Sequence, residues 1–339
     1  MGSPNVSKIL VIGATGYIGR HLVEASVKLG HPTFALARPI TSSHSTEKIN
    51  LIQSFKNNGV NVLLGDLNDH KWLVDAIKKV DVVFSVFGHE PCIQLEEQTH
   101  IISAIKKAGN IKRYFPSEFG FDVDRLHILE PAKSVLAIKV KIREAIRKEG
   151  IPFTIVSCNF CFTYFLSRLG QVEETTIPND RIFILGDGNT KVTKASGNIY
   201  ISLIHYFGLT MLHLAAVIFV GEHDIATYAI KAAEDERTLN KILYMRPPAN
   251  IYSHNELISL WEKKKNITLK RIYVAEEEVL TKINESPQPF PFFYAIAHAG
   301  FIKGETTNFD IDPTVGVEAS QLYPDVNYTT VENFMDQFM

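Results

Sequence analysis

The chain has 339 residues, of which 45% are hydrophobic, so it can bury a large core and is long enough for two lobes. Its 35 Lys and Arg against 37 Asp and Glu give a net charge of −2, without the basic excess typical of nucleic-acid binding. The stretch MGSPNVSKILVIG has no signal-peptide pattern and only three cysteines occur, so we expect a cytoplasmic protein without a disulfide framework.

Three glycines recur at every third position in the stretch VIGATGYIGR, residues 11–20. The apolar run Lys8–Gly13 predicts a buried strand, and Tyr17–Lys28 has the apolar spacing of a helix. Such a strand-to-helix turn can bind a pyrophosphate, because the helix N-terminus offers unpaired N–H groups and residues without Cβ let the anion approach. The spacing alone would also suit an ordinary glycine-rich turn.

Strands and helices alternate over about the first 160 residues. The further predicted strands are His31–Arg38, Val60–Leu67, Asp81–Gly88, Ile111–Gly120 and Pro152–Asn159. Predicted helices end near Asn57 and cover about Leu95–Lys107 and Ala132–Lys148. Continuous apolar strands separated by helices predict a doubly wound α/β fold with a parallel sheet covered on both faces. Further along, the alternation breaks down and proline and aromatic residues increase, which indicates a substrate lobe.

The residue at the end of the second predicted strand selects the cofactor. An NAD site places Asp or Glu there to accept from the ribose 2′-OH, whereas NADP needs a cation for the 2′-phosphate. This chain has Arg38, and Lys48 could add a second charge, although an exposed lysine is more often simply solvated. Asp66, after the third strand, could reach the adenine or be an ordinary loop aspartate.

The predicted helix Ala132–Lys148 carries a candidate base. At about 100° per residue its apolar residues share one face, and Lys139 lies only about 40° from Val135 on that face, while Lys141, Arg143 and Lys148 point away. A lysine at the margin of an apolar face either snorkels or works as a base with a lowered pKa. Short-chain dehydrogenases use a Tyr-x-x-x-Lys pair, and Val135 stands here in place of the tyrosine.

Cys158 and Cys161 form a C-x-x-C pattern in or just after a predicted strand. Residues three apart on a strand face opposite sides, so we expect no shared metal ion there.

Longer motifs carry a resemblance to a plant family. The chain resembles isoflavone reductases, pinoresinol-lariciresinol reductases and phenylcoumaran benzylic ether reductases of the NmrA type in GATGYIG, HPTFALAR, GDLND, KRYFPSEFG, EPAKSV, IPFTIVSCNF, ILGDGN, DIATYAIKAAED, TLNKILYMRPPANIYSHNEL and LYPDVNYTTVE. These motifs cover nearly the whole chain. They are most similar to those of phenylcoumaran benzylic ether reductases.

The resemblance implies an NADPH-binding Rossmann domain and a smaller C-terminal substrate-binding domain. The division implied is 1–157 for the first domain, with segments near 217–234 and 265–280 packing on it, and 158–339 mainly for the second. Carried over by position, Lys139 is the general base, and the cofactor-binding residues are Gly13, Ala14, Thr15, Gly16, Tyr17, Ile18, Gly19, Arg38, Lys48 and Arg143.

The implied function is NADPH-dependent reduction of a small phenolic substrate, with opening of a phenylcoumaran benzylic ether in lignan metabolism favoured. Isoflavone reduction or another phenylpropanoid reduction is the alternative within the family. A redox sensor of the NmrA type, which binds NADP(H) without turnover, is the alternative of another class. No metal, nucleic-acid or membrane partner is expected, and the chain could form a homodimer.

One segment departs from the family pattern, which runs almost directly from GDGNTK to VIFVGEHDIATY. Residues 192–216 are an apolar insertion, and Ile199–Val220 contains no Asp, Glu, Lys or Arg. By length this stretch could span a membrane. We instead expect a tolerated surface insertion or translated noncoding sequence, because a span would place the two halves of one fold on opposite sides of a bilayer. His205 and His213 within it do not suggest a metal site.

Overall fold

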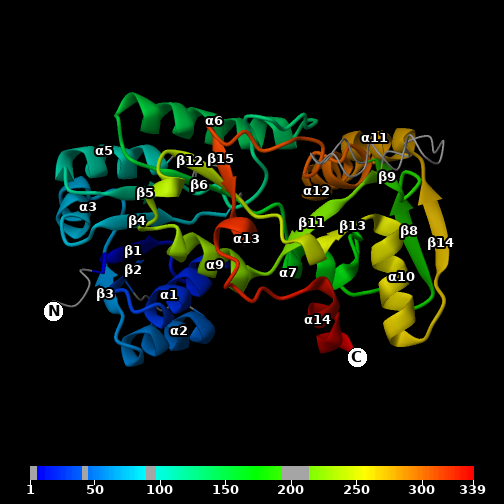
Figure 1. Ribbon diagram of the computed structural model, residues 1–339, viewed down its shortest axis with the longest axis horizontal. Helices are drawn as coiled ribbons and strands as arrows, with labels where there is room; N and C mark the ends of the chain where they lie inside the picture. Colours follow the sequence, from blue (N-terminus) through cyan, green and yellow to red (C-terminus); the bar gives the residue numbers. More distant parts are fainter. Residues whose placement is uncertain (1–5, 40–44, 89–96, 192–213) are drawn as a thin grey trace.

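The computed structural model describes residues 6–39, 45–88, 97–191 and 214–339 (Figure 1). Its central layer is a parallel sheet in the order β3-β2-β1-β4-β5, so the order reverses between β1 and β4. The strands are β1 (Ile9–Ile12), β2 (Thr33–Ala37), β3 (Asn61–Leu64), β4 (Val82–Ser85) and β5 (Arg113–Phe115). This confirms the predicted doubly wound α/β fold, and ligands bind such sheets at the carboxyl ends of the strands beside the reversal.

Three further strands continue the layer beyond β5. The bridge between Tyr114 and Phe153 joins β5 to the chain just before β6, which then pairs in parallel with β12, and β12 with β15. Their bounds are β6 (Thr154–Ser157), β12 (Lys241–Tyr244) and β15 (Gly316–Glu318). Segments far apart in the sequence therefore extend the central layer with a second, three-stranded sheet.

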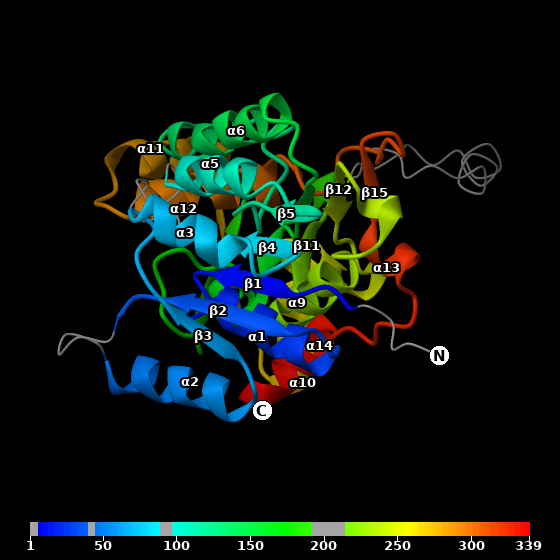
Figure 2. The same ribbon diagram turned by 90° about the vertical axis from the view of Figure 1, so that its left-hand side faces the viewer.

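Helices cover both faces of this sheet (Figure 2). One face carries α1 (Gly19–Lys28), α2 (Thr46–Asn57) and α9 (Glu222–Lys231), and the other carries α3 (His70–Ile77), α5 (Gln98–Ala108) and α6 (Ala132–Lys148). Each buries an apolar stripe; α6, for example, packs Ile138, Ile142 and Ile146 into the core beneath it. Helix α3 is absent from the predicted elements, although Asp69, which caps it by accepting from the Trp72 N–H at 3.0 Å, is a usual helix-start signal.

The remaining elements build a second core around aromatic side chains such as Phe160, Phe219 and Phe301. Its strands are β7 (Phe160–Cys161), β8 (Arg181–Leu185), β11 (Val217–Val220), β13 (Ile251–Tyr252) and β14 (Lys270–Val274). Its helices are α7 (Phe162–Phe165), α10 (His254–Lys265), α11 (Glu276–Glu285), α12 (Phe290–Ala297) and α14 (Val331–Met335), while α13 (Ala319–Leu322) joins the first core.

The predicted division at residue 157 stays a prediction, but the packing of the two later segments is visible. Helix α9, within 217–234, lies against α1 in the first core. The segment 265–280 does not pack on the first core as predicted, because its strand β14 pairs with β8, and Val274 and Val279 belong to the second core.

The strands on either side of the insertion pair with each other. Strands β9 (Thr190–Lys191) and β10 (Leu214–Ala215) pair antiparallel, and the Ala216 carbonyl accepts from the Thr306 and Thr307 hydroxyls at 3.2 and 3.0 Å. Residues 214–216 are therefore part of the fold, and β11 buries the end of the charge-free stretch. Residues 192–213, with both histidines, lie outside the described residues. In the ranges that are described, no helix is long and apolar enough to cross a bilayer.

Candidate cofactor and catalytic site

The glycine-rich turn between β1 and α1 has a geometry that only glycine permits. Gly13 has φ of 86°, and a Cβ on it would collide with the Val86 carbonyl oxygen. A Cβ on Gly19 would collide with the Gly13 carbonyl, and the Gly16 N–H donates to that same carbonyl at 2.9 Å. The turn therefore lies flat against the end of β4, at the reversal of strand order, as a dinucleotide site requires.

The helix that follows this turn is open to an anion. Ile18, at the N-cap of α1, provides no side-chain cap, and no acidic residue occupies the first turn. Gly16 is exposed, and Thr15 and Tyr17 are half-buried, whereas Ala14 and Ile18 are buried beneath them. Uncapped N–H groups and the positive end of the helix dipole stabilise a negative group at this position. The turn thus fits the diphosphate of a dinucleotide.

Two cations meet beyond the end of β2. Arg38 follows the strand and is exposed, and Lys48 lies in the first turn of α2, which Ser45 caps. Partial burial, and then the nearby Arg38 charge, lower the pKa of Lys48. Two neighbouring cations form a suitable binding site for a 2′-phosphate. Asp66 is exposed, and its carboxylate accepts from the Asn68 N–H at 3.0 Å, as an ordinary loop aspartate does.

A row of contacts along the strand ends leads from the glycine turn to Lys139. Val86, against Gly13, is followed by Phe87, whose N–H donates to the Ser117 hydroxyl at 2.8 Å. The next residue, Glu118, accepts from Lys139 Nζ through its backbone carbonyl at 2.5 Å. The structure therefore places the candidate base on the same sheet edge as the glycine turn.

Lys139 is more deeply buried than its helix position predicts. Its exposed fraction is 2%, whereas the sequence pattern predicts a place at the margin of the apolar face. Burial lowers the pKa of Lys139, and the Glu118 charge works against that shift. A buried amine that keeps one hydrogen-bond acceptor can serve as a base near neutral pH.

The predicted direction of Arg143 is wrong, because its side chain is 1% exposed. Arg143 follows Lys139 by four residues, so both lie on one helical stripe. The Arg143 guanidinium binds both carboxylate oxygens of Glu118 at 2.9 and 3.0 Å and Asp122 at 2.6 Å, with Asp124 at 3.0 Å. Its contact with the cofactor stays a prediction.

Several polar residues at this edge are not predicted from the sequence. Inside the sheet edge, the Ser85 hydroxyl donates to the Gln98 side-chain oxygen at 2.9 Å and lies 2.8 Å from the Tyr114 hydroxyl. That Gln98 oxygen also accepts from the Ser117 N–H at 2.7 Å, so it ties the ends of β4 and β5 to the start of α5. Ser85, Tyr114 and Ser117 lie within predicted strands and Gln98 within a predicted helix, so the sequence pattern gives no signal for these contacts.

Tyr17 connects the glycine turn to the second core. Its hydroxyl donates to Glu222, and the same carboxylate oxygen accepts from the Thr163 N–H at 2.8 Å. The Tyr17 ring also meets Tyr164 edge to face, with centroids 4.8 Å apart. The cofactor turn and the start of α7 are therefore fixed relative to each other. Sequence spacing gives no signal for a partner 205 residues away.

The two cysteines are in contact, contrary to the predicted strand geometry. Strand β6 ends at Ser157, and Asn159 has φ of 59°, so the chain turns before β7 begins at Phe160. The hydrogen bond with Cys158, together with burial, raises the pKa of the Cys161 thiol well above its usual range. No group of three or more metal-ligating side chains occurs within the described ranges.

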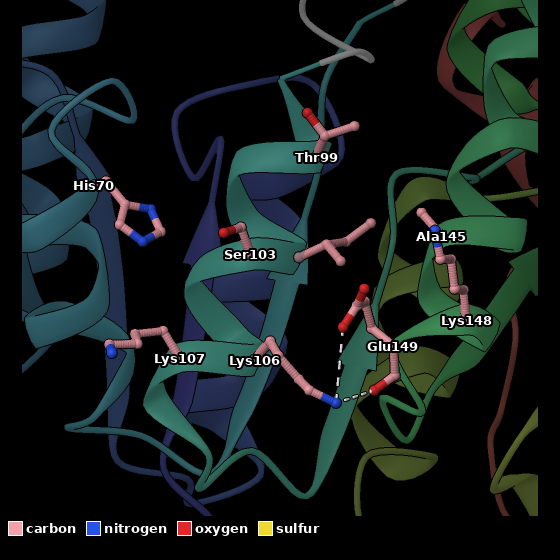
Figure 3. A pocket seen from close by; sticks show the side chains of 9 residues that line it. His70, Thr99, Ser103, Lys106, Lys107, Ala145, Lys148 and Glu149 are labelled. Carbon is pink, nitrogen blue, oxygen red and sulfur yellow. Dashed lines mark hydrogen bonds and ion pairs between the residues drawn. The ribbon is translucent and has the colours of Figure 1, made fainter.

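A pocket of about 540 Å³ opens between α3, α5 and α6 (Figure 3). Lys106, which lines the pocket, donates to the Glu149 backbone carbonyl at 2.7 Å and pairs with the Glu149 carboxylate at 3.7 Å. Its lining includes none of the residues predicted to bind the cofactor or to catalyse. The candidate site is therefore the strand edge and not this pocket.

Comparison with known proteins agrees with this geometry. The model of the NmrA-like family matches residues 5–335. The isoflavone reductase-like protein of Olea europaea is 55% identical over 98% of this chain and 99% of its own length. Phenylcoumaran benzylic ether reductase POP1 of Populus trichocarpa is 53% identical over the same shares, and eugenol synthase 2 of Clarkia breweri is 54% identical over 100% of both chains.

Solved structures show the same fold. The crystal structure of isoflavone reductase has a TM-score of 0.87 and 43% identity over 99% of this chain and 100% of that one. The binary complex of leucoanthocyanidin reductase with NADPH from Vitis vinifera has a TM-score of 0.84 and 32% identity, covering 98% and 99%. These findings confirm the family predicted from the motifs. The chain belongs to the NmrA-like family and, within it, to the isoflavone reductase-like group of NADPH-dependent oxidoreductases.

Proposed function

We propose that this protein reduces the benzylic ether of a phenylcoumaran with NADPH, and that Lys139 is the base. The observation that carries the proposal is the position of Lys139 Nζ. It is buried, hydrogen-bonded to the Glu118 carbonyl, and on the same strand edge as the glycine turn. A reductase needs a proton-transferring group at this place, and Val135 leaves no tyrosine on α6 to supply it.

Two groups of residues would hold different parts of the cofactor. The glycine turn and the N-terminus of α1 would hold the diphosphate, and Arg38 with Lys48 would hold the 2′-phosphate. NADPH, once bound, supplies the hydride. Tyr17 fixes the turn to Glu222, so the cofactor site and the aromatic second core keep a constant relative position.

Lys139 begins the reaction by accepting the phenolic proton of the substrate. The phenol lies para to the benzylic carbon, so its electrons pass through the ring and break the benzylic C–O bond. The products of this step are a quinone methide and a phenoxide, which takes a proton from solvent. After reduction at the benzylic carbon the aromatic ring is restored as a phenolate, and the Lys139 ammonium returns the proton. The net change consumes one hydride and one proton.

A second candidate follows from the eugenol synthases among the relatives, which are 54% and 52% identical to this chain. Eugenol is a 4-allylphenol. Phenol deprotonation, loss of a carboxylate from the end of the conjugated side chain and hydride addition to the resulting quinone methide would produce such a compound by the same kind of steps. The same base would serve, so the two candidates differ in the shape of the substrate and not in the chemistry.

The test is NADPH oxidation with product analysis on a phenylcoumaran that carries the free phenol. We expect turnover with this substrate and none with its phenol methyl ether, because the methyl ether has no proton for Lys139 to remove. A 4-hydroxycinnamyl ester in parallel tests the second candidate. Cofactor binding without turnover on either substrate would instead support the redox-sensor function and contradict ours.

Two finer properties complete the proposal. A homodimer and a cytoplasmic location are our working assignments, the second because a chain with only three cysteines suits a reducing compartment. Light scattering of the purified chain and fractionation of the source tissue test them.

A further inference from the structure

The loop between β5 and α6 contacts Lys139 through the Glu118 backbone carbonyl. We propose that Glu118 and Arg143 are positioning residues, whose buried ion pair presents the Glu118 carbonyl to Lys139 Nζ and balances the charge around that amine. The inference rests on the proposed role of Lys139. Glu118 and Arg143 are 3% and 1% exposed, and two parallel hydrogen bonds of 2.9 and 3.0 Å join them.

The backbone of this loop is strained at the residue after Glu118. Phe119 has φ of 32°, in a region that a bulky L residue rarely adopts. Such a conformation persists only where surrounding contacts enforce it. The carbonyl of the next residue, Gly120, accepts from the Asn159 N–H at 3.1 Å and from the Ser157 hydroxyl at 3.3 Å. These bonds hold the loop on one side.

Arg143 holds the loop on the other side, through Glu118 and Asp122. The Asp122 carboxylate accepts from Arg143 at 2.6 Å and from the Tyr244 hydroxyl of β12 at 2.6 Å. One guanidinium on α6 therefore clamps both ends of the strained turn. Because Lys139 lies one helical turn before Arg143, the clamp also fixes the distance between the Glu118 carbonyl and the Lys139 amine.

Four groups face the Lys139 amine from three parts of the chain. Glu118 comes from the loop and Arg143 from α6, while Cys158 and Cys161 come from the ends of β6 and β7. The Glu118 charge favours the ammonium, and the Arg143 charge opposes it. Since the two charges form one ion pair, they largely cancel at Lys139. Loss of either charge should therefore move the pKa of Lys139, and the two losses should move it in opposite directions.

The test compares Glu118→Gln, Arg143→Gln and Asp122→Asn, with the pKa of Lys139 read by NMR of the lysine side chain without substrate. The Lys139 signal is assigned by its absence in Lys139→Met. Removing the Glu118 charge should lower the pKa by about 1 unit or more, and removing the Arg143 charge should raise it by a similar amount. Asp122→Asn is the matched control, because it removes a carboxylate from Arg143 that does not face Lys139, so we expect less than half of the Glu118 shift.

The acid limb of kcat against pH should move with these values, since the base must be neutral to accept a proton. It moves to lower pH in Glu118→Gln and to higher pH in Arg143→Gln, while KM changes little. Arg143→Lys, which keeps the charge but not the paired hydrogen bonds, should restore the pH limb and leave kcat reduced. If Arg143→Gln does not fold, the contrast between Glu118→Gln and Asp122→Asn decides.

Equal shifts in Glu118→Gln and Asp122→Asn, or shifts of one sign for both charge removals, would overturn the proposal. The NMR titration reads Lys139 in the absence of turnover. It therefore judges the positioning role even if another residue proves to be the base, and a failure of the proposed reaction is recognised separately by an active Lys139→Ala.

Discussion

Arg38 makes the choice between NADPH and NADH testable. Replacing Arg38 by Ala removes one of the two cations at the end of β2 and leaves Lys48. NADH has no 2′-phosphate, so the substitution should weaken NADPH binding and hardly change NADH binding. The ratio of the two affinities therefore isolates the contribution of this one charge.

The magnitude follows from the exposure of the side chain. A hydrogen bond to a charged group contributes about 1.5–3 kcal/mol, and solvent and salt reduce this for an exposed group such as Arg38. We therefore take a value just below this range, about 1.4 kcal/mol, which is a tenfold preference for NADPH. Arg38→Ala should abolish most of it, and the remainder should depend on Lys48.

The assay is titration of both cofactors by calorimetry or by nicotinamide fluorescence, at low and at moderate salt. Lys56→Ala is the matched control, since Lys56 is an exposed cation in the last turn of the same helix as Lys48. It should leave the preference unchanged. Equal affinities for NADPH and NADH in the unmodified protein, or a full preference in Arg38→Ala, would refute the assignment of the 2′-phosphate site.

Three further predictions concern the turn, the second core and the insertion. Gly19→Ala should weaken NADPH and NADH binding alike, because its Cβ would meet the Gly13 carbonyl. Gly30→Ala, whose Cβ meets nothing within 4 Å but whose φ of 84° strains the backbone, should lower stability and spare binding in the same titration. His254 is buried with its pKa lowered to about 4, so the unfolded chain binds its proton first as pH falls. The free energy of unfolding from urea melts should therefore fall between pH 6.5 and 4, by up to about 3 kcal/mol for this group. His254→Gln should remove that part of the fall, and an unchanged pH slope in the variant would contradict the prediction. Replacing residues 192–213 by Asn-Gly should close β9 and β10 as a two-residue hairpin and raise soluble yield with NADPH binding intact, whereas an unfolded product would show that the segment belongs to the core.

The elements most readily predicted from sequence are those with local signals. The glycine turn, the strands of the first sheet and helix α6 follow from apolar period and from residues without Cβ, and α6 occupies the residues predicted for it. Arg38 and Lys48 are brought together because Arg38 follows the end of β2 and Lys48 lies at the start of the next helix. Apolar periodicity and glycine positions depend on residues that are close in the sequence, so they predict these features well.

The features that escape prediction depend on contacts between distant parts of the chain. Arg143 is buried because Glu118 and Asp122, on a loop before the helix, compensate its charge, and helical periodicity treats any arginine as solvated. The contact of Cys158 with Cys161 depends on the backbone of Asn159, which residue type alone does not require. Residues that hold the base in place were therefore visible only in the structure.

The most direct test of the account is the turnover of Lys139→Ala on a phenylcoumaran with a free phenol. We expect kcat to fall by roughly 10² or more, which is typical for loss of a general base, while NADPH affinity stays nearly unchanged. Lys141→Ala, an exposed lysine on the same helix, should retain full activity. Turnover of Lys139→Ala close to that of the unmodified protein, with cofactor bound, would contradict the assignment of Lys139 as the base.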